Sequence, residues 1–141
     1  MTEAERQAIE FACARVSMAL GMAADRHDAD AYASFYTVDG EFDRRGEVVK
    51  GRAAIAATIK AWPVDFVIRH FSGPIVIDVQ DANNATGVTY FTSYQHRGPL
   101  NEKGVAPMKD PQAFAEYRDR FVRTPEGWRI AYRKTVPVFA R

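Results

Sequence analysis

The amino-acid sequence predicts an α+β fold, with N-terminal helices packed on a curved, mostly antiparallel sheet that encloses a pocket. Apolar residues recur at helical spacing in the first part of the chain, whereas the later segments alternate as strands do. Short turns separate those later segments, which favours antiparallel neighbours. With 141 residues and no repeat or linker, the chain is expected to form one domain over 1–141.

The first helix is expected over residues 2–25. Thr2 and Glu5 match a capping box, in which the two residues satisfy each other's backbone N–H groups. Seven apolar residues follow at helical spacing and should form the stripe that faces the core. These residues are Ile9, Ala12, Cys13, Val16, Ala19, Leu20 and Ala23.

Shorter elements connect this helix to the sheet. Asp28 is a good N-cap for a second helix that continues to about Phe35. Pro63 stops a third helix, because proline cannot continue one. The elements expected between Phe35 and Pro63 are a turn at Asp39-Gly40, a hairpin over residues 41–51 and the third helix over residues 52–62.

The rest of the sequence reads as strands. Gly, Pro, Asn and charged residues separate the strand-like segments and favour turns. The expected strands cover residues 66–79 with a break at Gly73-Pro74, 85–97, 113–124 and 127–138, and residues 98–111 form a longer loop.

Composition limits the classes of function. The formal net charge is +1, so nucleic acid and anionic membranes are not expected as partners. The N-terminal decapeptide is polar, and residues 11–24 are too short and too charged to span a membrane. One cysteine, Cys13, excludes an internal disulfide and fits a reducing compartment. These features predict a soluble, cytoplasmic protein.

Asp25 is the first candidate for chemistry. By helical angle it continues a second apolar row, Phe11, Met18 and Met22, on nearly the opposite side from the core stripe. This row predicts that the C-terminal half of the helix is covered on both sides. A carboxylate there also lies at the end of the helix dipole that favours cations. The alternative is a solvent-exposed Asp25 beside Arg26.

Two histidines lie on expected strands. His70 shares a strand face with Phe66 and Ile68, and His96 shares a face with Tyr90 and Tyr94. A carboxylate beside an imidazole fixes its tautomer and makes it a competent base. The alternatives are a core histidine at 70 and a strand-end histidine at 96.

Asp25, His70 and His96 together also match the donor types of a metal site. The sequence contains no HxH, HxxxH or HExxH pattern, so we expect no metal and no organic cofactor. On the last strand, Arg133 is a candidate for stabilising an enolate or oxyanion, if its face lines the pocket. Alternation puts it with Arg129 and Ala131, but does not show which face points inward.

The sequence resembles the SnoaL-like branch of the NTF2-like superfamily. Four stretches carry the resemblance over nearly the whole chain: DRHDADAYASFYTVDGEFD, GRAAIAATI, RHFSGPIVIDV and YRDRFVRTPEGWRIAYRKTV. The resemblance implies a cone-shaped α+β fold with a pocket between the helices and the curved sheet.

Within that branch the chain resembles scytalone dehydratase, hexachlorocyclohexane dehydrochlorinase and bile-acid 7α-dehydratase. Their shared pair, an Asp near the end of the first helix and a His on a strand, falls on Asp25 and His70. The second His of scytalone dehydratase falls on His96. The Arg that follows the GxW turn of the dehydrochlorinase falls on Arg133.

Other positions depart from scytalone dehydratase. Its two carbonyl-polarising tyrosines correspond to Ala24 and Arg44, and its pocket Asn corresponds to Arg118 or Asp119. Scytalone itself is therefore not the expected substrate. Two tyrosines beside His96, Tyr90 and Tyr94, are alternative candidates for the polarising role. Met18, Met22 and Arg44 complete the expected substrate-binding set.

The resemblance implies a cofactor-independent dehydratase acting by β-elimination on a small, apolar, cyclic hydroxy-carbonyl compound. In that reaction His70 is the base, Asp25 its partner, His96 a proton donor and Arg133 an anion stabiliser. An isomerase or cyclase using the same pair, or a non-catalytic binding or assembly subunit, is the alternative. Relatives with this pair are often trimers, so a homo-oligomer is expected, a trimer before a dimer.

Overall fold

The computed structural model describes residues 1–140 and has helices first and strands after them, as the sequence predicts. The helices are α1 (Glu3–Asp25), α2 (Ala29–Ser34) and α3 (Arg52–Lys60). The strands are β1 (Tyr36–Arg44), β2 (Glu47–Lys50), β3 (Val67–Asp81), β4 (Asn84–His96), β5 (Ala113–Thr124) and β6 (Gly127–Phe139).

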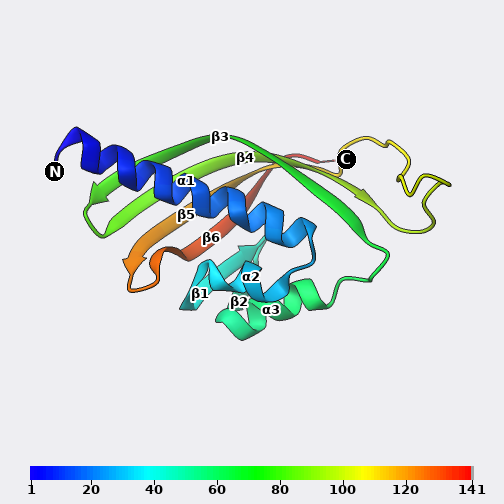
Figure 1. Cartoon of the computed structure of the whole chain (residues 1–141), viewed down its shortest axis with the longest axis horizontal. Helices are drawn as coiled ribbons and strands as arrows, with labels where there is room; N and C mark the ends of the chain where they lie inside the picture. The colour runs from blue at the N-terminus through cyan, green and yellow to red at the C-terminus, as the bar shows by residue number, and fades with distance from the viewer. Residues whose placement is uncertain (141) are drawn as a thin grey trace.

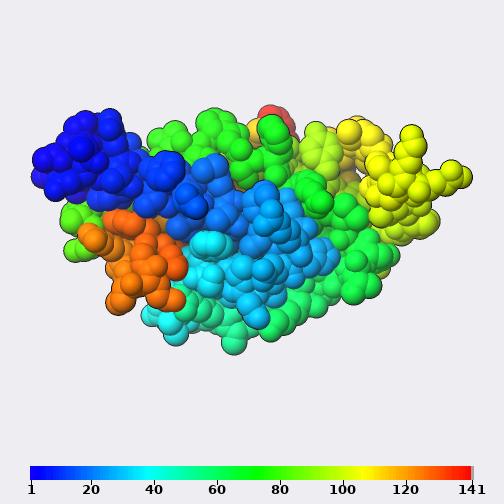
Figure 2. Space-filling model, in the orientation of Figure 1, coloured from blue at the N-terminus to red at the C-terminus, as the bar shows by residue number. Residues whose placement is uncertain are grey.

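The six strands form one open sheet in the order β2-β1-β6-β5-β4-β3. Every neighbouring pair is antiparallel except β1 and β6, which are parallel. Figure 1 shows α1 crossing one face of the sheet, with α2 and α3 beside β1 and β2. Figure 2 shows the N-terminal end of α1 and the loop between β4 and β5 at opposite ends of the molecule. None of the helices in residues 1–140 combines the length and apolarity needed to cross a membrane.

The helix boundaries follow the expected caps. The Thr2 hydroxyl accepts from the Glu5 N–H at 3.1 Å, and the Glu5 carboxylate accepts from the Thr2 N–H at 2.7 Å. The Asp28 side chain accepts from the Ala31 N–H and starts α2. The capping box and the second N-cap are thus confirmed.

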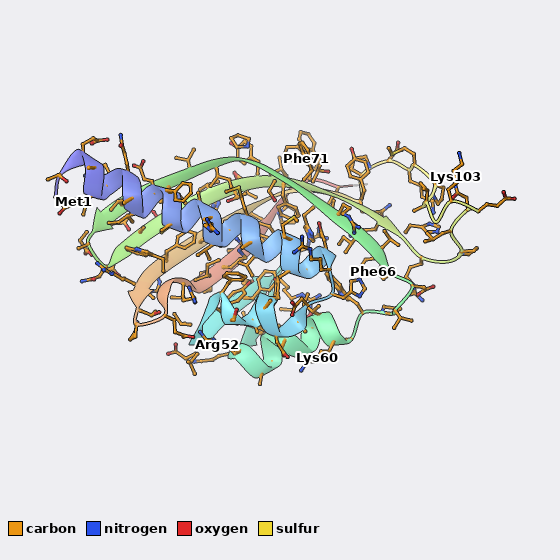
Figure 3. All side chains as sticks on the ribbon, viewed as in Figure 1. Met1, Arg52, Lys60, Phe66, Phe71 and Lys103 are labelled. Carbon is orange, nitrogen blue, oxygen red and sulfur yellow. The ribbon has the colours of Figure 1, made fainter. Side chains whose placement is uncertain are left out.

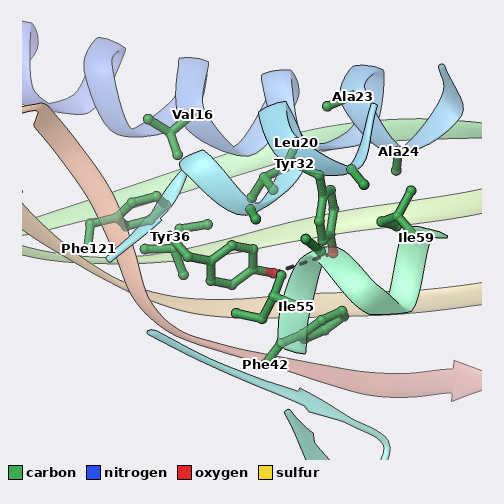
Figure 4. Close-up of a cluster of buried hydrophobic side chains, with 14 of the residues drawn as sticks. Val16, Leu20, Ala23, Ala24, Tyr32, Tyr36, Phe42, Ile55, Ile59 and Phe121 are labelled. Atoms are coloured by element: carbon green, nitrogen blue, oxygen red, sulfur yellow. Dashed lines mark hydrogen bonds between the residues drawn. The ribbon is translucent and has the colours of Figure 1, made fainter. Parts of the chain in front are cut away.

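The core lies between the helices and the inner face of the sheet. Leu20 from α1, Ile55 from α3 and Tyr36 from β1 are fully buried and meet in its centre. Figure 4 shows these side chains together, with Tyr32 and Tyr36 joined through their hydroxyls, whose oxygens lie 3.4 Å apart.

Two register irregularities determine which side chains face inward. In β3 the register shifts between Ser72 and Ile75, at the predicted Gly73-Pro74 break. In the β5–β6 pairing it shifts so that Ile130 and Arg133 are both buried although they are three residues apart. Simple alternation wrongly puts Ile130 and Arg133 on opposite faces. It takes no account of the one extra residue that β6 contains at this register shift.

A third irregularity corrects the expected turn at Asp39-Gly40. Both residues lie inside β1, where the pairing with β6 is interrupted between Tyr36 and Glu41. A Cβ on Gly40 would lie 3.0 Å from both the Thr37 carbonyl oxygen and the Tyr36 Cβ. Glycine therefore marks a close backbone approach within the strand, not a chain reversal.

The outer face of the sheet exposes several large apolar side chains. Phe71 is 75% exposed, and Figure 3 shows it pointing away from α1. On the neighbouring strands Phe114 contacts Tyr90 at 6.5 Å and Phe139 at 5.5 Å between ring centroids. These four rings form an apolar outer face, a feature that often marks an interaction surface.

Candidate active site

A cavity of about 320 Å³ lies between the helices and the inner face of the sheet. Leu20, Gly21 and Ala24 from α1 line one side, and Ile59 from α3 lines another. The inner face of the sheet supplies the remaining wall, including His70 of β3. Its volume falls in the lower part of the range of small-molecule sites, about 300–1,000 Å³.

Asp25 and His70 meet where the end of α1 reaches the middle of β3. The Asp25 Oδ1 atom lies 2.6 Å from the His70 Nδ1 atom. The same carboxylate accepts the backbone N–H of His70, at 3.0 Å to Oδ2 and 3.2 Å to Oδ1. The side chains of His70 and Asp25 are only 12% and 8% exposed. Bonds to both backbone and ring hold the imidazole in one orientation.

This contact assigns the roles of the two ring nitrogens of His70. An ionised carboxylate only accepts hydrogen bonds, so Nδ1 carries the proton and donates it to Asp25. In the neutral ring Nε2 then keeps its lone pair. No hydrogen bond to Nε2 is found within residues 1–140, and His70 lines the cavity. The arrangement leaves one unpartnered basic nitrogen at a cavity wall.

Aromatic side chains continue from His70 across the inner face. The His70 and Phe91 ring centroids are 5.9 Å apart, and Phe91 stacks on Tyr117 at 4.0 Å with an interplanar angle of 6°. The Arg133 guanidinium carbon lies 3.9 Å from the Tyr117 ring centroid, in cation–π geometry. Contacts on four neighbouring strands, β3 to β6, therefore connect His70 to Arg133.

Arg133 is held in a buried polar network. Its Nε and Nη2 atoms donate to the two carboxylate oxygens of Asp119 at 2.7 and 2.8 Å. Nη2 also donates to the Ser17 hydroxyl at 2.9 Å, and that oxygen lies 3.1 Å from the Thr89 hydroxyl oxygen. Burial alone would lower the pKa of Arg133, but the Asp119 charge and hydrogen bonds outweigh it and raise that pKa. Arg133 is thus permanently charged.

The Nη1 atom of Arg133 makes none of these bonds. Because Arg133 lines the cavity, Nη1 is the part of the guanidinium that is free to donate to a ligand. Two phenols, Tyr32 and Tyr117, line the same cavity. Burial raises the pKa of both, the Arg133 charge opposing it, so both remain hydrogen-bond donors at neutral pH.

Several predicted pocket residues lie elsewhere. Met18 and Met22 are 48% and 52% exposed on α1, so the expectation that both sides of this helix are covered is wrong for the single chain. The helix packs through its core stripe and through Gly21, where a Cβ would lie 3.7 Å from the His70 Cβ. Asp25, one turn after Gly21, therefore reaches β3.

Three further residues of the predicted site, Tyr90, Tyr94 and His96, lie on the outer face of β4. They share a face as predicted, but Phe91 and Ser93, on the other face, are the residues that line the cavity. His96 Nε2 donates to the Pro99 carbonyl at 3.1 Å, outside this cavity. Tyr90, Tyr94 and His96 therefore do not line the cavity that contains His70, because the opposite face of β4 forms its wall. Tyr94 and His96 line a separate pocket on the outer face, together with residues 105–109.

The structure resolves the choice between Arg118 and Asp119 on β5. Asp119, not Arg118, points inward, because its carboxylate is fully buried against Arg133 while Arg118 is 59% exposed. Ala24 and Arg44 both line the cavity. Three residues that line the cavity were not predicted from the sequence: Tyr32, Trp62 and Tyr117. The only sequence signal for Tyr117 was its position two residues before Asp119 on an expected strand.

Residues 1–140 contain no group of three His, Cys, Asp or Glu side chains arranged to hold a metal ion. The Asp25 carboxylate is bonded to the ring and backbone of His70, and His96 lies on the other face of the sheet. The chemistry available at this cavity is therefore acid–base chemistry at His70 and hydrogen bonding from Tyr32, Tyr117 and Arg133.

A SnoaL-like domain model matches residues 5–134. The chain belongs to the SnoaL-like domain family. No curated protein matches its sequence at a significant level.

Solved structures share the NTF2-like fold of this family member. An NTF2-like protein with a cystatin-like fold from Novosphingobium aromaticivorans is 29% identical, with a TM-score of 0.74 over 97% of this chain and 84% of its own. A candidate scytalone dehydratase from that species is 15% identical, with a TM-score of 0.82 over 98% and 89%. A variant of the protein Rv3472 from Mycobacterium tuberculosis, of unknown function, is 24% identical. Its TM-score is 0.79, over 98% of this chain and 77% of its own.

The buried ion pair predicts a large effect on stability. Asp119→Asn removes the charge that neutralises Arg133, which should lower the free energy of unfolding by about 3–5 kcal/mol. Asp78→Asn, at an exposed aspartate on β3, is the control and should change it by less than about 0.5 kcal/mol. Urea denaturation measures both, and equal effects would contradict the predicted role of the pair.

Proposed function

We propose that this SnoaL-like protein is a cofactor-independent lyase that eliminates water from a small cyclic hydroxy-carbonyl compound, using Asp25 and His70. The 2.6 Å contact between Asp25 Oδ1 and His70 Nδ1, at the wall of the cavity, carries the proposal. The fold shared with a candidate scytalone dehydratase supports it.

The first step is proton abstraction. His70 Nε2 takes a proton from the carbon beside the substrate carbonyl, and the Asp25 carboxylate stabilises the imidazolium that forms. The electron pair of the broken C–H bond moves onto the carbonyl oxygen and gives an enolate. Tyr117, Tyr32 and the Nη1 group of Arg133 are the donors available to that oxygen.

The second step expels the hydroxyl group on the next carbon. The enolate electrons return to form the C=C bond as the C–O bond breaks. The leaving oxygen takes the proton from the His70 imidazolium and departs as water, which restores the neutral ring. His70 fills both roles because His96, the proton donor expected from sequence, is bonded to the Pro99 carbonyl on the other face.

Isomerisation is the alternative, and one observation favours it. His70 is the only histidine among the cavity-lining residues within the described part of the chain. A single base that keeps the proton can return it to a different carbon, as in ketosteroid isomerases, and then no group leaves. A product lighter by one water identifies elimination, and a product of unchanged mass identifies isomerisation.

Substitution of the pair is the direct test of the activity. On a cyclic β-hydroxy ketone that the wild type converts, His70→Gln should lower kcat/KM by about 10²–10⁴-fold, since the general base is lost. Asp25→Asn should also lower kcat/KM. Mass spectrometry of the product and steady-state rates measure both effects.

His96→Gln is the matched control, because it removes a histidine on the outer face of the same sheet. It should leave kcat/KM within about twofold of wild type, in the range of surface substitutions. Full activity of His70→Gln, in a protein that is folded by circular dichroism, would contradict the assignment of His70 as the general base.

We also propose that the chain forms a homo-oligomer, with a trimer expected before a dimer, through the apolar outer face. The exposed rings of Phe71, Tyr90, Phe114 and Phe139 on that face support this. Burying such a patch between copies would remove apolar surface from water.

Light scattering after size-exclusion chromatography tests the assembly. The wild type should have a mass of three 15.8 kDa chains, and Phe71→Lys should reduce it. Phe11→Lys, at a 66% exposed phenylalanine on α1, should leave the mass unchanged. A monomeric wild type at micromolar concentration would contradict the assembly.

A further inference from the structure

The wall of the cavity has an excess of positive charge. Three arginines line it, Arg44, Arg45 and Arg133, against one carboxylate, Glu47. The Asp25 and Asp119 carboxylates are engaged with His70 and Arg133 and do not line the cavity. A ligand that fills this space therefore meets more cationic than anionic groups.

The charge of Arg44 has no partner. Unlike Arg133, it makes no ion pair within 4.0 Å and no side-chain hydrogen bond to any of residues 1–140. Arg52 and Arg97, by contrast, form ion pairs, with Glu126 at 2.8 Å and with Asp65 at 3.1 Å. Arg44 is also partly buried, so water replaces a partner less fully than at an exposed site.

Arg44 lines the same cavity as His70, on the opposite part of the sheet. Phe42 pairs with Arg133 in the parallel β1–β6 ladder, and Arg44 is two residues further along the same strand. Burial raises the pKa of Tyr32, and the charges of Arg133 and Arg44 both oppose that rise. Arg44 is thus within electrostatic reach of a phenol that lines the same cavity.

We propose that the substrate carries a carboxylate that binds Arg44. This inference rests on the proposed lyase function. A guanidinium presents a planar fork that matches a carboxylate with two parallel hydrogen bonds. The carboxylate fixes one end of the molecule at β1. The acidic C–H then lies toward His70 on β3, at the other side of the sheet.

Glu47 is the carboxylate that lines the cavity with Arg44. The two residues are directly opposite in the β1–β2 hairpin, yet their charged groups are not in contact. Glu47 lines the same cavity, and its negative charge opposes the approach of an anionic ligand. Removing the Glu47 charge should therefore strengthen carboxylate binding, whereas removing the Arg44 charge should weaken it.

Isothermal titration with two matched probes, one anionic and one neutral, tests the proposal. The probes are 2-naphthoate and 2-naphthamide, which have nearly the same shape and differ in charge. The wild type should bind 2-naphthoate at least about tenfold more tightly, the effect of one charge-assisted hydrogen-bonded pair. Arg44→Gln should abolish this preference with little change for 2-naphthamide, and Glu47→Gln should increase it.

Arg118→Gln is the control, because Arg118 is 59% exposed on the outer face and should not affect either probe. Equal affinity of the wild type for both probes, no binding of either at millimolar concentration, or a preference that survives Arg44→Gln would overturn the carboxylate site.

His70→Gln separates this site from the proposed reaction. It should keep the Arg44-dependent preference for 2-naphthoate while it loses turnover. A preference for 2-naphthoate in a protein that eliminates water from no hydroxy ketone would keep the site and refute the lyase. Turnover of neutral hydroxy ketones with no preference between the probes would refute the site and keep the lyase.

Discussion

The contact between the Asp25 carboxylate and His70 connects the fold of this protein with its cavity. The carboxylate joins the last turn of α1 to the middle of β3 by accepting both the backbone N–H and the ring N–H of one residue. The same bonds fix the height at which α1 crosses the sheet and the orientation of the imidazole. A carboxylate at the C-terminal end of a helix is unfavourable by itself. Here the hydrogen bonds to β3, and a 3.5 Å bond from Arg69 to the Asp25 carbonyl oxygen, compensate for it.

The inner face of the sheet is built around a second buried interaction. Arg133 and Asp119 form a bidentate ion pair with almost no exposed surface, and Ser17 of α1 closes the network. Such a pair adds little stability over well-packed apolar residues, but it is costly to break. The Arg133 guanidinium lies over the Tyr117 ring and so keeps a fixed positive charge beside that phenol. These bonds fix the orientation of the polar groups on the inner face, which favours preorganised electrostatic stabilisation.

The sequence predicted the order of elements well because helix caps, helical stripes and strand alternation are local signals. Asp25 was singled out because it continues the row of Met18 and Met22 at the end of the helix, and His70 because it shares a strand face with Ile68. That row is exposed in the structure, so Asp25 reaches His70 for a different reason, the close packing of α1 on β3 at Gly21. The choice of face on β4 was not local. Alternation groups Tyr90 with Tyr94 and Phe91 with Ser93, but it does not show which group faces α1. In the structure Phe91 and Ser93 form the cavity wall.

Long-range register explains the other differences. The extra residue in the β5–β6 pairing brings Arg133 to the buried side with Ile130, and alternation cannot detect it. Arg133 and Asp119 lie on two strands whose register contains that irregularity. Their ion pair could therefore not be predicted from sequence spacing. Tyr32 and Tyr117 were missed for a similar reason: each looks like an ordinary apolar position until the helices and the sheet are assembled.

The position of the proton on His70 tests directly whether Asp25 orients the imidazole to act as a base. Long-range ¹H–¹⁵N correlation spectra of the three histidines, recorded above the ordinary histidine pKa of about 6.5, report the tautomer of each ring. His70→Gln assigns the signal. We predict that the proton lies on Nδ1 of His70 in the wild type, and that Asp25→Ala removes this preference for Nδ1. A proton on Nε2 in the wild type would contradict it, because the nitrogen at the cavity wall could not then act as the base.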